Sequence, residues 1–282
     1  MIHTPKSFVL KHKIRKSIYK YKSSDPYLSV NFYQRISDYC VTDLNIIDNF
    51  KLKNARVLYI KAHLLDQLLL ENLRSIHAKV LIVAGSDNSF GCIPTKLPSG
   101  LKHIFAQNSL IPDNNQLSVI PIGIEPPHLG WNGVPKLMVN RYTPETRLHR
   151  VLVGPFGNTN PQRLFTTNYL KSNEGPWDVY EQKMYPDAFA DLHRKYRMTL
   201  CLTGHGLDTY RVWETLYRGG LPLVERNAWS LNMVRNGFPL EIIEEDNSTE
   251  LAKFCTTVEK FDYSNERILY TDYWKGRILE HL

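Results

Sequence analysis

Short apolar runs alternate with longer amphipathic stretches along the chain from about residue 55 onward. The runs at 57–60, 80–84, 103–106 and 119–122 predict buried strands, because polar or turn-forming residues follow each of them. Between the first two runs, residues 64–75 predict a helix with leucines on one face. Apolar strands separated by helices are typical of a parallel sheet, so the pattern predicts an α/β fold.

This alternation breaks once and then resumes. The break is a turn-rich stretch that contains Pro126, Pro127, Gly130, Gly133 and Pro135. We place a domain junction there, between about 125 and 150, which divides the chain into two Rossmann-like domains at 1–135 and 136–282. After the break, the pattern predicts strands at 150–154, 198–202, 221–224 and 241–246, and helices at 185–197, 209–218, 248–261 and 264–280.

Composition narrows the class of protein and the class of partner. A hydrophobic content of 43% and an aromatic content of 11% are those of an ordered globular chain. The formal charge of +7 favours an anionic partner: a nucleotide, a phosphorylated lipid, an acidic glycan, a membrane surface or nucleic acid. Residues 1–24 contain six lysines and one arginine but no acid, so they could contact an anionic membrane; a solvated basic edge is the alternative.

The expected cellular location follows from two features that we do not find in the sequence, a membrane span and a secretory signal. No apolar run reaches the length of a membrane span, and the first residues lack the features of a secretory signal. We therefore expect the protein in the cytoplasm, either free or at the inner face of the membrane. Cys40, Cys92, Cys201 and Cys255 are widely spaced, which predicts buried thiols rather than a zinc site or disulfides.

The stretch 199–224 carries the strongest pattern of the chain. An apolar run is followed by the turn Gly204-His205-Gly206, by a helix, and by a second apolar run at 221–224, which predicts a βαβ unit. On the helix Arg211, Glu214 and Arg218 form a polar stripe, which begins where open α/β sheets bind ligands. The turn lacks the third glycine of a dinucleotide fingerprint.

Each polar residue of this unit has two interpretations. Glu214 could accept hydrogen bonds from ribose hydroxyls, or it could form a helical ion pair with Arg211 or Arg218. His205 could donate to a phosphate or sugar oxygen, or be an ordinary loop residue. Asp208 could contact a ligand or cap the helix. A second loop, 155–163, includes Asn158 and Arg163 and could bind a diphosphate through backbone N–H groups and the guanidinium, although its residues are also common in turns.

The order D-x-x-R-x-x-E-x-x-x-x-G-x-x-P, formed by Asp208, Arg211, Glu214, Gly219 and Pro222, resembles the nucleotide-sugar signature of exostosin-like glycosyltransferases and their bacterial relatives. The resemblance is sharpest over 200–224 and faint in the N-terminal half. It implies a GT-B type enzyme with an interdomain cleft, an acceptor site on the N-terminal domain and a donor site on the C-terminal domain. It also implies that Glu214 holds the donor nucleotide and that the loop with Arg163 faces the donor. Together with the candidates above, the expected donor-binding residues are Asn158, Arg163, Gly204, His205, Gly206, Asp208, Arg211 and Glu214.

The resemblance also implies the reaction. A sugar would pass from a UDP- or GDP-linked donor to a glycan or lipid-linked acceptor, with inversion, in bacterial surface polysaccharide or lipopolysaccharide synthesis. A general base must then face the cleft from the first domain, and the candidates at predicted strand ends are Asp87, Glu125 and His63. No Asp-x-Asp pair follows a strand, so we expect a metal-independent enzyme without a cofactor.

Two other classes of function remain open from the sequence. A non-catalytic nucleotide- or glycan-binding module would keep Glu214 but lack a carboxylate able to act as a base. A basic nucleic-acid-binding protein would account for the charge and the tyrosines, but would need cations and exposed aromatic residues along a groove. We do not expect nucleic acid as the partner.

Overall fold

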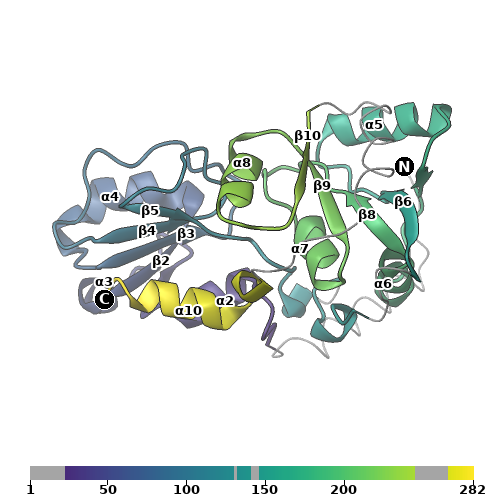
Figure 1. The fold of residues 1–282 in the computed structure, drawn as a ribbon. Helices are drawn as coiled ribbons and strands as arrows, with labels where there is room; N and C mark the ends of the chain where they lie inside the picture. The colour runs from purple at the N-terminus through teal and green to yellow at the C-terminus, as the bar shows by residue number, and fades with distance from the viewer. Residues whose placement is uncertain (1–22, 130–131, 141–145, 245–265) are drawn as a thin grey trace.

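The computed structural model describes residues 23–129, 132–140, 146–244 and 266–282, and it contains two parallel five-stranded sheets (Figure 1). The first sheet has the order β1-β2-β3-β4-β5 and the second the order β10-β9-β8-β6-β7. The strands are β1 (Tyr39–Val41), β2 (Val57–Lys61), β3 (Val80–Ala84), β4 (His103–Ala106), β5 (Leu117–Val119), β6 (Leu148–Val153), β7 (Trp177–Val179), β8 (Tyr196–Leu200), β9 (Leu221–Glu225) and β10 (Glu241–Ile243). The predicted α/β class is confirmed, and both sheets are consistent with Rossmann-like folds.

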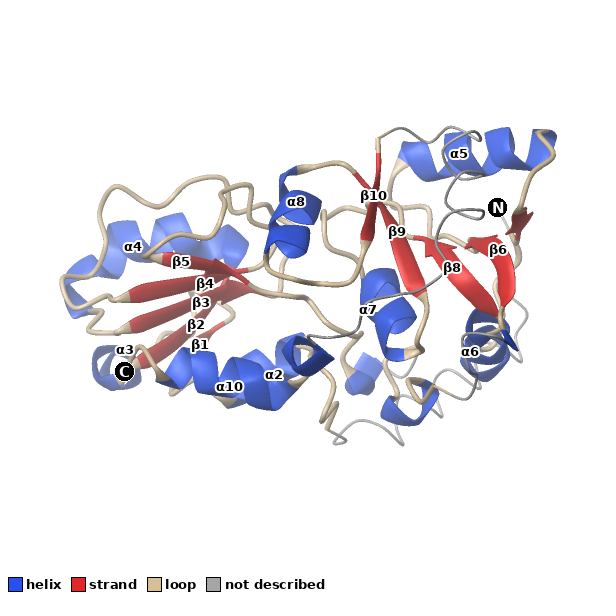
Figure 2. Cartoon of the chain, viewed as in Figure 1, coloured by secondary structure: helices blue, strands red, loops and turns tan. Residues whose placement is uncertain are grey.

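Helices cover both faces of the first sheet (Figure 2). The α-helices of the chain are α2 (Val30–Arg35), α3 (Asn49–Asn54), α4 (Leu65–Asn72), α5 (Pro161–Ser172), α6 (Pro186–Arg194), α7 (Tyr210–Tyr217), α8 (Ala228–Arg235) and α10 (Thr271–Leu279). Alternate strand residues point to opposite faces: Tyr59 packs in one cluster with Trp274 of α10, and Leu58 in another with Leu68 of α4. Burial on both faces explains why these strands read as continuous apolar runs.

The second sheet contains a reversal of strand order. The chain passes from β6 outward to the edge strand β7, and then returns to place β8 on the other side of β6. From β8 it continues through α7 to β9 and then to β10, all parallel, as the predicted βαβ unit requires. The loops that follow β6 and β8 therefore leave the sheet at the point where ligands of open α/β sheets bind.

One apolar cluster runs from the first sheet to the helices of the second half. It contains Phe105 of β4 together with Trp213 of α7, Trp229 of α8 and Trp274 of α10. The hydroxyl of Tyr217 at the end of α7 accepts from the N–H of Leu28 (3.1 Å) and donates to the carbonyl of Leu269 (2.6 Å).

The C-terminal helix α10 packs back onto the first half of the chain. Thr271 N–H donates to the carbonyl of Pro26 (3.1 Å), and Lys79 Nζ donates to the carbonyl of Leu282 (2.9 Å). Trp274 and Ile278 of this helix are buried in the apolar cluster that contains residues of the first sheet.

Several predicted bounds were wrong by a few residues. The helix predicted at 185–197 ends at Arg194, because Tyr196 and Arg197 already belong to β8, where both are buried. The strand predicted at 119–122 ends at Val119, although Ile120 N–H still bonds the carbonyl of Ala106. The helix predicted at 248–261 lies outside the described residues, as does nearly all of the basic segment 1–24. Within the described ranges, no helix is long and apolar enough to cross a bilayer.

Candidate functional site

A small pocket lies at the carboxyl ends of β6 and β8, where the strand order of the second sheet reverses. Its volume is about 180 Å³. One wall comes from the segment that leaves the first sheet, and the others come from the loop after β6 and from the start of α7. The lining residues are Glu125, Asn132, Pro155, Phe156, Gly157, Arg163, Thr209, Tyr210, Arg211 and Glu214.

Glu214 is buried in the wall of this pocket, with only 3% of its side chain exposed. Its Oε2 atom lies 3.5 Å from Arg211 Nε and 3.5 Å from Arg218 Nη1. Both distances exceed the usual N–H···O range of about 2.7–3.2 Å, so the carboxylate is held loosely between two cations. From the sequence, Glu214 could either form an ion pair on the helix or lie in a ligand site. In the structure it forms the ion pairs and also lies in the wall of the pocket.

Arg211 joins α7 to the loop that follows β6. Its Nη1 and Nη2 atoms donate to the carbonyls of Gly154 and Pro155, each at 3.1 Å. The guanidinium also lies over the ring of Phe189, 4.4 Å from the centroid. These contacts fix the cation at the pocket and shape the loop around it.

Arg163, in the first turn of α5, holds the turn after β8 in the same way. It donates from Nε to the carbonyl of Thr203, from Nη2 to the carbonyl of Leu202 and from Nη1 to Thr159 Oγ1, each at 2.8 Å. Burial, and after it the charge of Arg211, lower the pKa of Arg163. A Cβ atom on Gly204 would lie 3.1 Å from Arg163 Nη2, so the glycine allows this close approach. Asn158 is exposed in the preceding loop and lies outside the pocket lining.

Asp208 lies inside the molecule and joins the two halves of the chain. Its Oδ2 accepts from the N–H of Ile122 (2.7 Å), its Oδ1 accepts from Trp213 Nε1 (2.7 Å), and its own N–H donates to Asn108 Oδ1 (2.8 Å). Burial raises the pKa of Asp208 to about 8, against the opposing effect of these N–H donors. The position of the helix cap belongs to Thr209, so the structure supports a linking role for Asp208.

His205 and Asp87 face each other beside the pocket. His205 Nδ1 lies 3.6 Å from Asp87 Oδ2, and both side chains are more than half exposed. A Cβ atom on Gly206 would lie 2.8 Å from Asn108 Nδ2 and 3.3 Å from the Asp87 carbonyl, so the turn lies directly against the loop after β3.

The three candidate bases occupy different places. Glu125 lines the pocket and accepts from the N–H of Gly133 (3.4 Å). Asp87 lies beside His205, and His63 is exposed in the 3-10 turn Ala62–Leu64 after β2, outside the lining. The structure thus brings together Glu125, Arg163, Arg211 and Glu214, and separately Asp87, His205 and Gly206.

Six lining residues are not among the candidates from the sequence: Asn132, Pro155, Phe156, Gly157, Thr209 and Tyr210. Tyr210 is the first residue of α7 and lines the pocket. Burial, and after it the charges of Glu125 and Asp87, raise the pKa of Tyr210. As the first residue of the helix it lies over the preceding turn, which is the signal that could have revealed it. Phe156 and Asn132 lie in loops without a periodic pattern.

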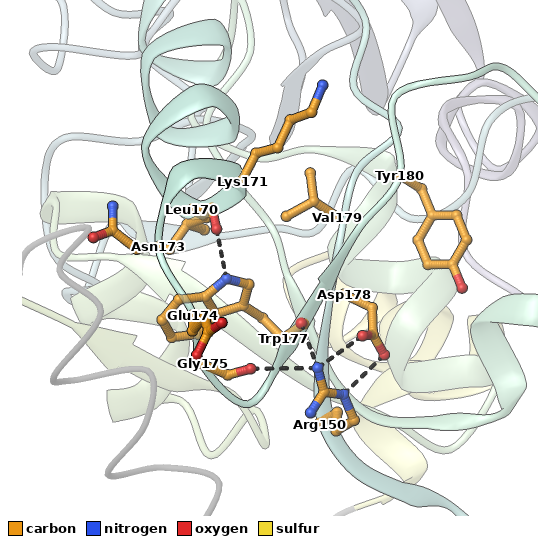
Figure 3. Close-up of a pocket in the computed structure, with 10 residues that line it drawn as sticks. All are labelled: Arg150, Leu170, Lys171, Asn173, Glu174, Gly175, Trp177, Asp178, Val179 and Tyr180. Carbon is orange, nitrogen blue, oxygen red and sulfur yellow. Dashed lines mark hydrogen bonds and ion pairs between the residues drawn. The ribbon is translucent and has the colours of Figure 1, made fainter.

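A larger cavity of about 760 Å³ lies at the free edge of β7 (Figure 3). Its polar groups bind one another: Arg150 donates to both carboxylate oxygens of Asp178 (2.9 and 2.8 Å) and to the carbonyl of Trp177 (2.6 Å), while Trp177 Nε1 donates to the carbonyl of Leu170 (2.8 Å). It lies at the flank of the sheet rather than at the carboxyl ends of its strands. We therefore take the smaller pocket as the candidate site.

In the described part of the chain, no group of three or more His, Cys, Asp or Glu side chains is placed to hold a metal ion. A comparison with protein-family models gives no match, and neither does a comparison with curated protein sequences.

Proposed function

We propose that the chain is a metal-independent glycosyltransferase of GT-B type, which moves a sugar from a UDP- or GDP-linked donor to a glycan or lipid-linked acceptor. The observation that carries the proposal is the pocket at the strand-order reversal, in which a buried carboxylate, Glu214, lies between guanidinium groups. This is where a doubly wound sheet binds a ligand. The resemblance of the 208–222 pattern to exostosin-like enzymes supplies the substrate class, and with it bacterial surface polysaccharide or lipopolysaccharide synthesis at the inner face of the membrane.

The size of the pocket suggests which part of the donor enters it. A volume of about 180 Å³ is below the roughly 300–1,000 Å³ of most small-molecule sites, so the pocket takes only part of a nucleotide sugar. Glu214 is suited to accept from the ribose hydroxyls. Arg163, Arg211 and the backbone of the loop after β6 are suited to the diphosphate, whose charge grows as the glycosyl bond breaks.

The base is assigned to Glu125, because it is the candidate that lines the pocket. Its carboxylate takes the proton of the acceptor hydroxyl while that oxygen attacks the anomeric carbon. The bond from this carbon to the diphosphate breaks, and the nucleotide diphosphate leaves with the electron pair. One displacement of this kind inverts the anomeric centre.

A thermal-shift screen with UDP, GDP, CMP and their sugars tests donor binding. A ligand at a hundredfold excess over its Kd should raise the unfolding free energy by about 2.7 kcal/mol. We expect Glu214→Gln to lose this response relative to its own ligand-free melting temperature. The matched control is Glu181→Gln, which alters a surface ion pair with Lys171 and should respond like the parent.

Transfer assays then separate an enzyme from a binding module. Glu125→Gln should keep the donor-induced shift but lose sugar transfer. If the parent binds a donor and transfers nothing to any glycan, the module is the better description. If nucleotide sugars have no effect while oligonucleotides bind with strong salt dependence, the proposal is wrong and a nucleic-acid-binding protein replaces it.

A further inference from the structure

On the side away from the pocket, Glu214 contacts the guanidinium of Arg218, which in turn contacts His193. Arg218 is the residue that follows α7, and His193 belongs to the last turn of α6. Their side chains are among the most deeply buried polar groups of the protein, with relative exposures of 0% and 1%. Neither belongs to the pocket lining, so neither can contact a ligand there directly.

The hydrogen bonds assign the protonation state of His193. Arg218 Nη1 lies 2.7 Å from His193 Nδ1, and an arginine can only donate, so Nδ1 is an unprotonated acceptor. The proton is then on Nε2, which lies 2.9 Å from Thr199 Oγ1 and 3.0 Å from Thr215 Oγ1. Thr215 donates its own hydroxyl proton to the carbonyl of Arg211 (2.6 Å), which leaves its oxygen free to accept from His193.

The surroundings favour this neutral form of His193. Burial, followed by the charges of Arg218, Arg211, Arg147 and Arg194, keeps the pKa of His193 well below its ordinary value. A protonated imidazole would lose the acceptor and repel the neighbouring guanidinium.

Arg218 is fixed from three sides. Its Nε donates to the carbonyl of Leu137 (3.0 Å), and its Nη1 points both to His193 Nδ1 and to Glu214 Oε2 (3.5 Å). Burial lowers the pKa of Arg218 to about 10, which leaves it charged at neutral pH. The guanidinium of Arg218 behind Glu214 therefore stays charged, and its orientation depends on the hydrogen bond to His193.

We propose that His193 and Arg218 are positioning residues for the ligand site: the neutral imidazole orients the guanidinium, and the guanidinium holds the Glu214 carboxylate at the pocket wall opposite Arg211. This rests on the proposed function, in which Glu214 binds the donor. A purely structural role would stabilise the fold but would leave the affinity of the ligand site unchanged when His193 or Arg218 is replaced.

The first test is independent of any ligand. Long-range ¹H–¹⁵N spectra of ¹⁵N-histidine-labelled protein, assigned with the His193→Asn variant, should show His193 protonated at Nε2 only and unchanged from pH 5 to pH 8. A protonated Nδ1, or a titration with a midpoint near the ordinary value of about 6.5, overturns the proposal.

The second test measures affinity for whichever of UDP or GDP stabilises the parent. We expect His193→Leu and Arg218→Met to weaken binding roughly 2- to 30-fold, as residues without ligand contact do when they act through another residue. His193→Asn keeps an acceptor near the Nδ1 position and should restore most of the affinity. The matched control is His149→Leu, because His149 also contacts an arginine, Arg197 (3.1 Å), but lies outside the pocket lining.

The outcomes separate the two proposals. If His193→Leu and Arg218→Met bind like the parent, the positioning role is wrong and the proposed function stands. If the leucine variant fails to fold, Arg218→Met and rescue by His193→Asn decide the question. If the parent binds neither UDP nor GDP, the proposed function fails and the positioning role fails with it.

Discussion

Replacing Asp208 by alanine tests how far the two halves of the chain depend on one buried carboxyl group. The substitution removes the acceptor of two buried donors, the N–H of Ile122 and Nε1 of Trp213, which now bond it at 2.7 Å each. A buried donor left without a partner costs about 1–3 kcal/mol, so the expected loss is roughly 2–6 kcal/mol in unfolding free energy. At about 2–4 °C per kcal/mol, the melting temperature should fall by at least about 4 °C.

Thermal melts and urea titrations followed by circular dichroism measure this loss. The control is Asp87→Ala, which changes an exposed carboxylate beside His205 and should stay within about 0.5 kcal/mol of the parent. An Asp208→Ala protein that melts like the control would refute the linking role. Loss of the nucleotide response at unchanged stability would instead return Asp208 to the donor site.

The pH dependence of the unfolding free energy provides a second test of the buried Asp208. The pKa of Asp208 is raised to about 8 in the folded protein, against about 3.9 for an ordinary aspartate. The folded state therefore keeps a proton that the unfolded chain releases, and this stabilisation is complete below pH 4 and is lost as the pH rises to 8. We expect the stability difference between the parent and Asp208→Asn to fall by up to about 1.4 kcal/mol per pH unit in this window; a constant difference would contradict the assignment.

Two further predictions use matched pairs of substitutions. Gly206→Ala should disturb the junction, because its Cβ atom would lie 2.8 Å from Asn108 Nδ2, whereas Gly157→Ala meets its nearest neighbour at 3.8 Å and should be tolerated; equal melting temperatures would contradict this. Trp274→Ala should cost about 3–5 kcal/mol in urea titrations because the indole is buried on α10, while Leu279→Ala on the same helix, 52% exposed, should change little.

The sequence predicts the strands that are buried on both faces better than those at the edges. The bounds of β3 and β4 agree with the prediction, because each is an apolar run between polar residues. The edge strands β1 and β7 were missed, since Tyr39–Val41 and Trp177–Val179 are too short to show a period. The start of β8 was predicted two residues too late, because Arg197 is a polar residue that is more typical of a helix or loop, although it is buried in this strand.

The candidate site was predictable where it depends on local spacing. Arg211 and Glu214 lie three residues apart on a helix, which places them on one face and in contact. One partner of the Asp208 carboxyl group, the backbone N–H of Ile122, was not predictable, because it lies 86 residues away and every non-proline residue carries such a donor. The position of Glu125 in the same pocket likewise depends on how the two halves pack.

The charge of Glu214 offers a last test of whether the site is functional. Burying a carboxylate is costly, and two cations at 3.5 Å give less compensation than close hydrogen bonds. We expect Glu214→Met alone to lose about 3–5 kcal/mol, since it leaves the buried charge of Arg218 without a counter-charge, and Glu214→Met with Arg218→Met to recover most of that loss. Both proteins should fail to respond to nucleotide sugars. A double variant less stable than Glu214→Met would show that the pair itself stabilises the fold, whereas recovery without ligand binding would indicate that the buried charges are retained for the ligand.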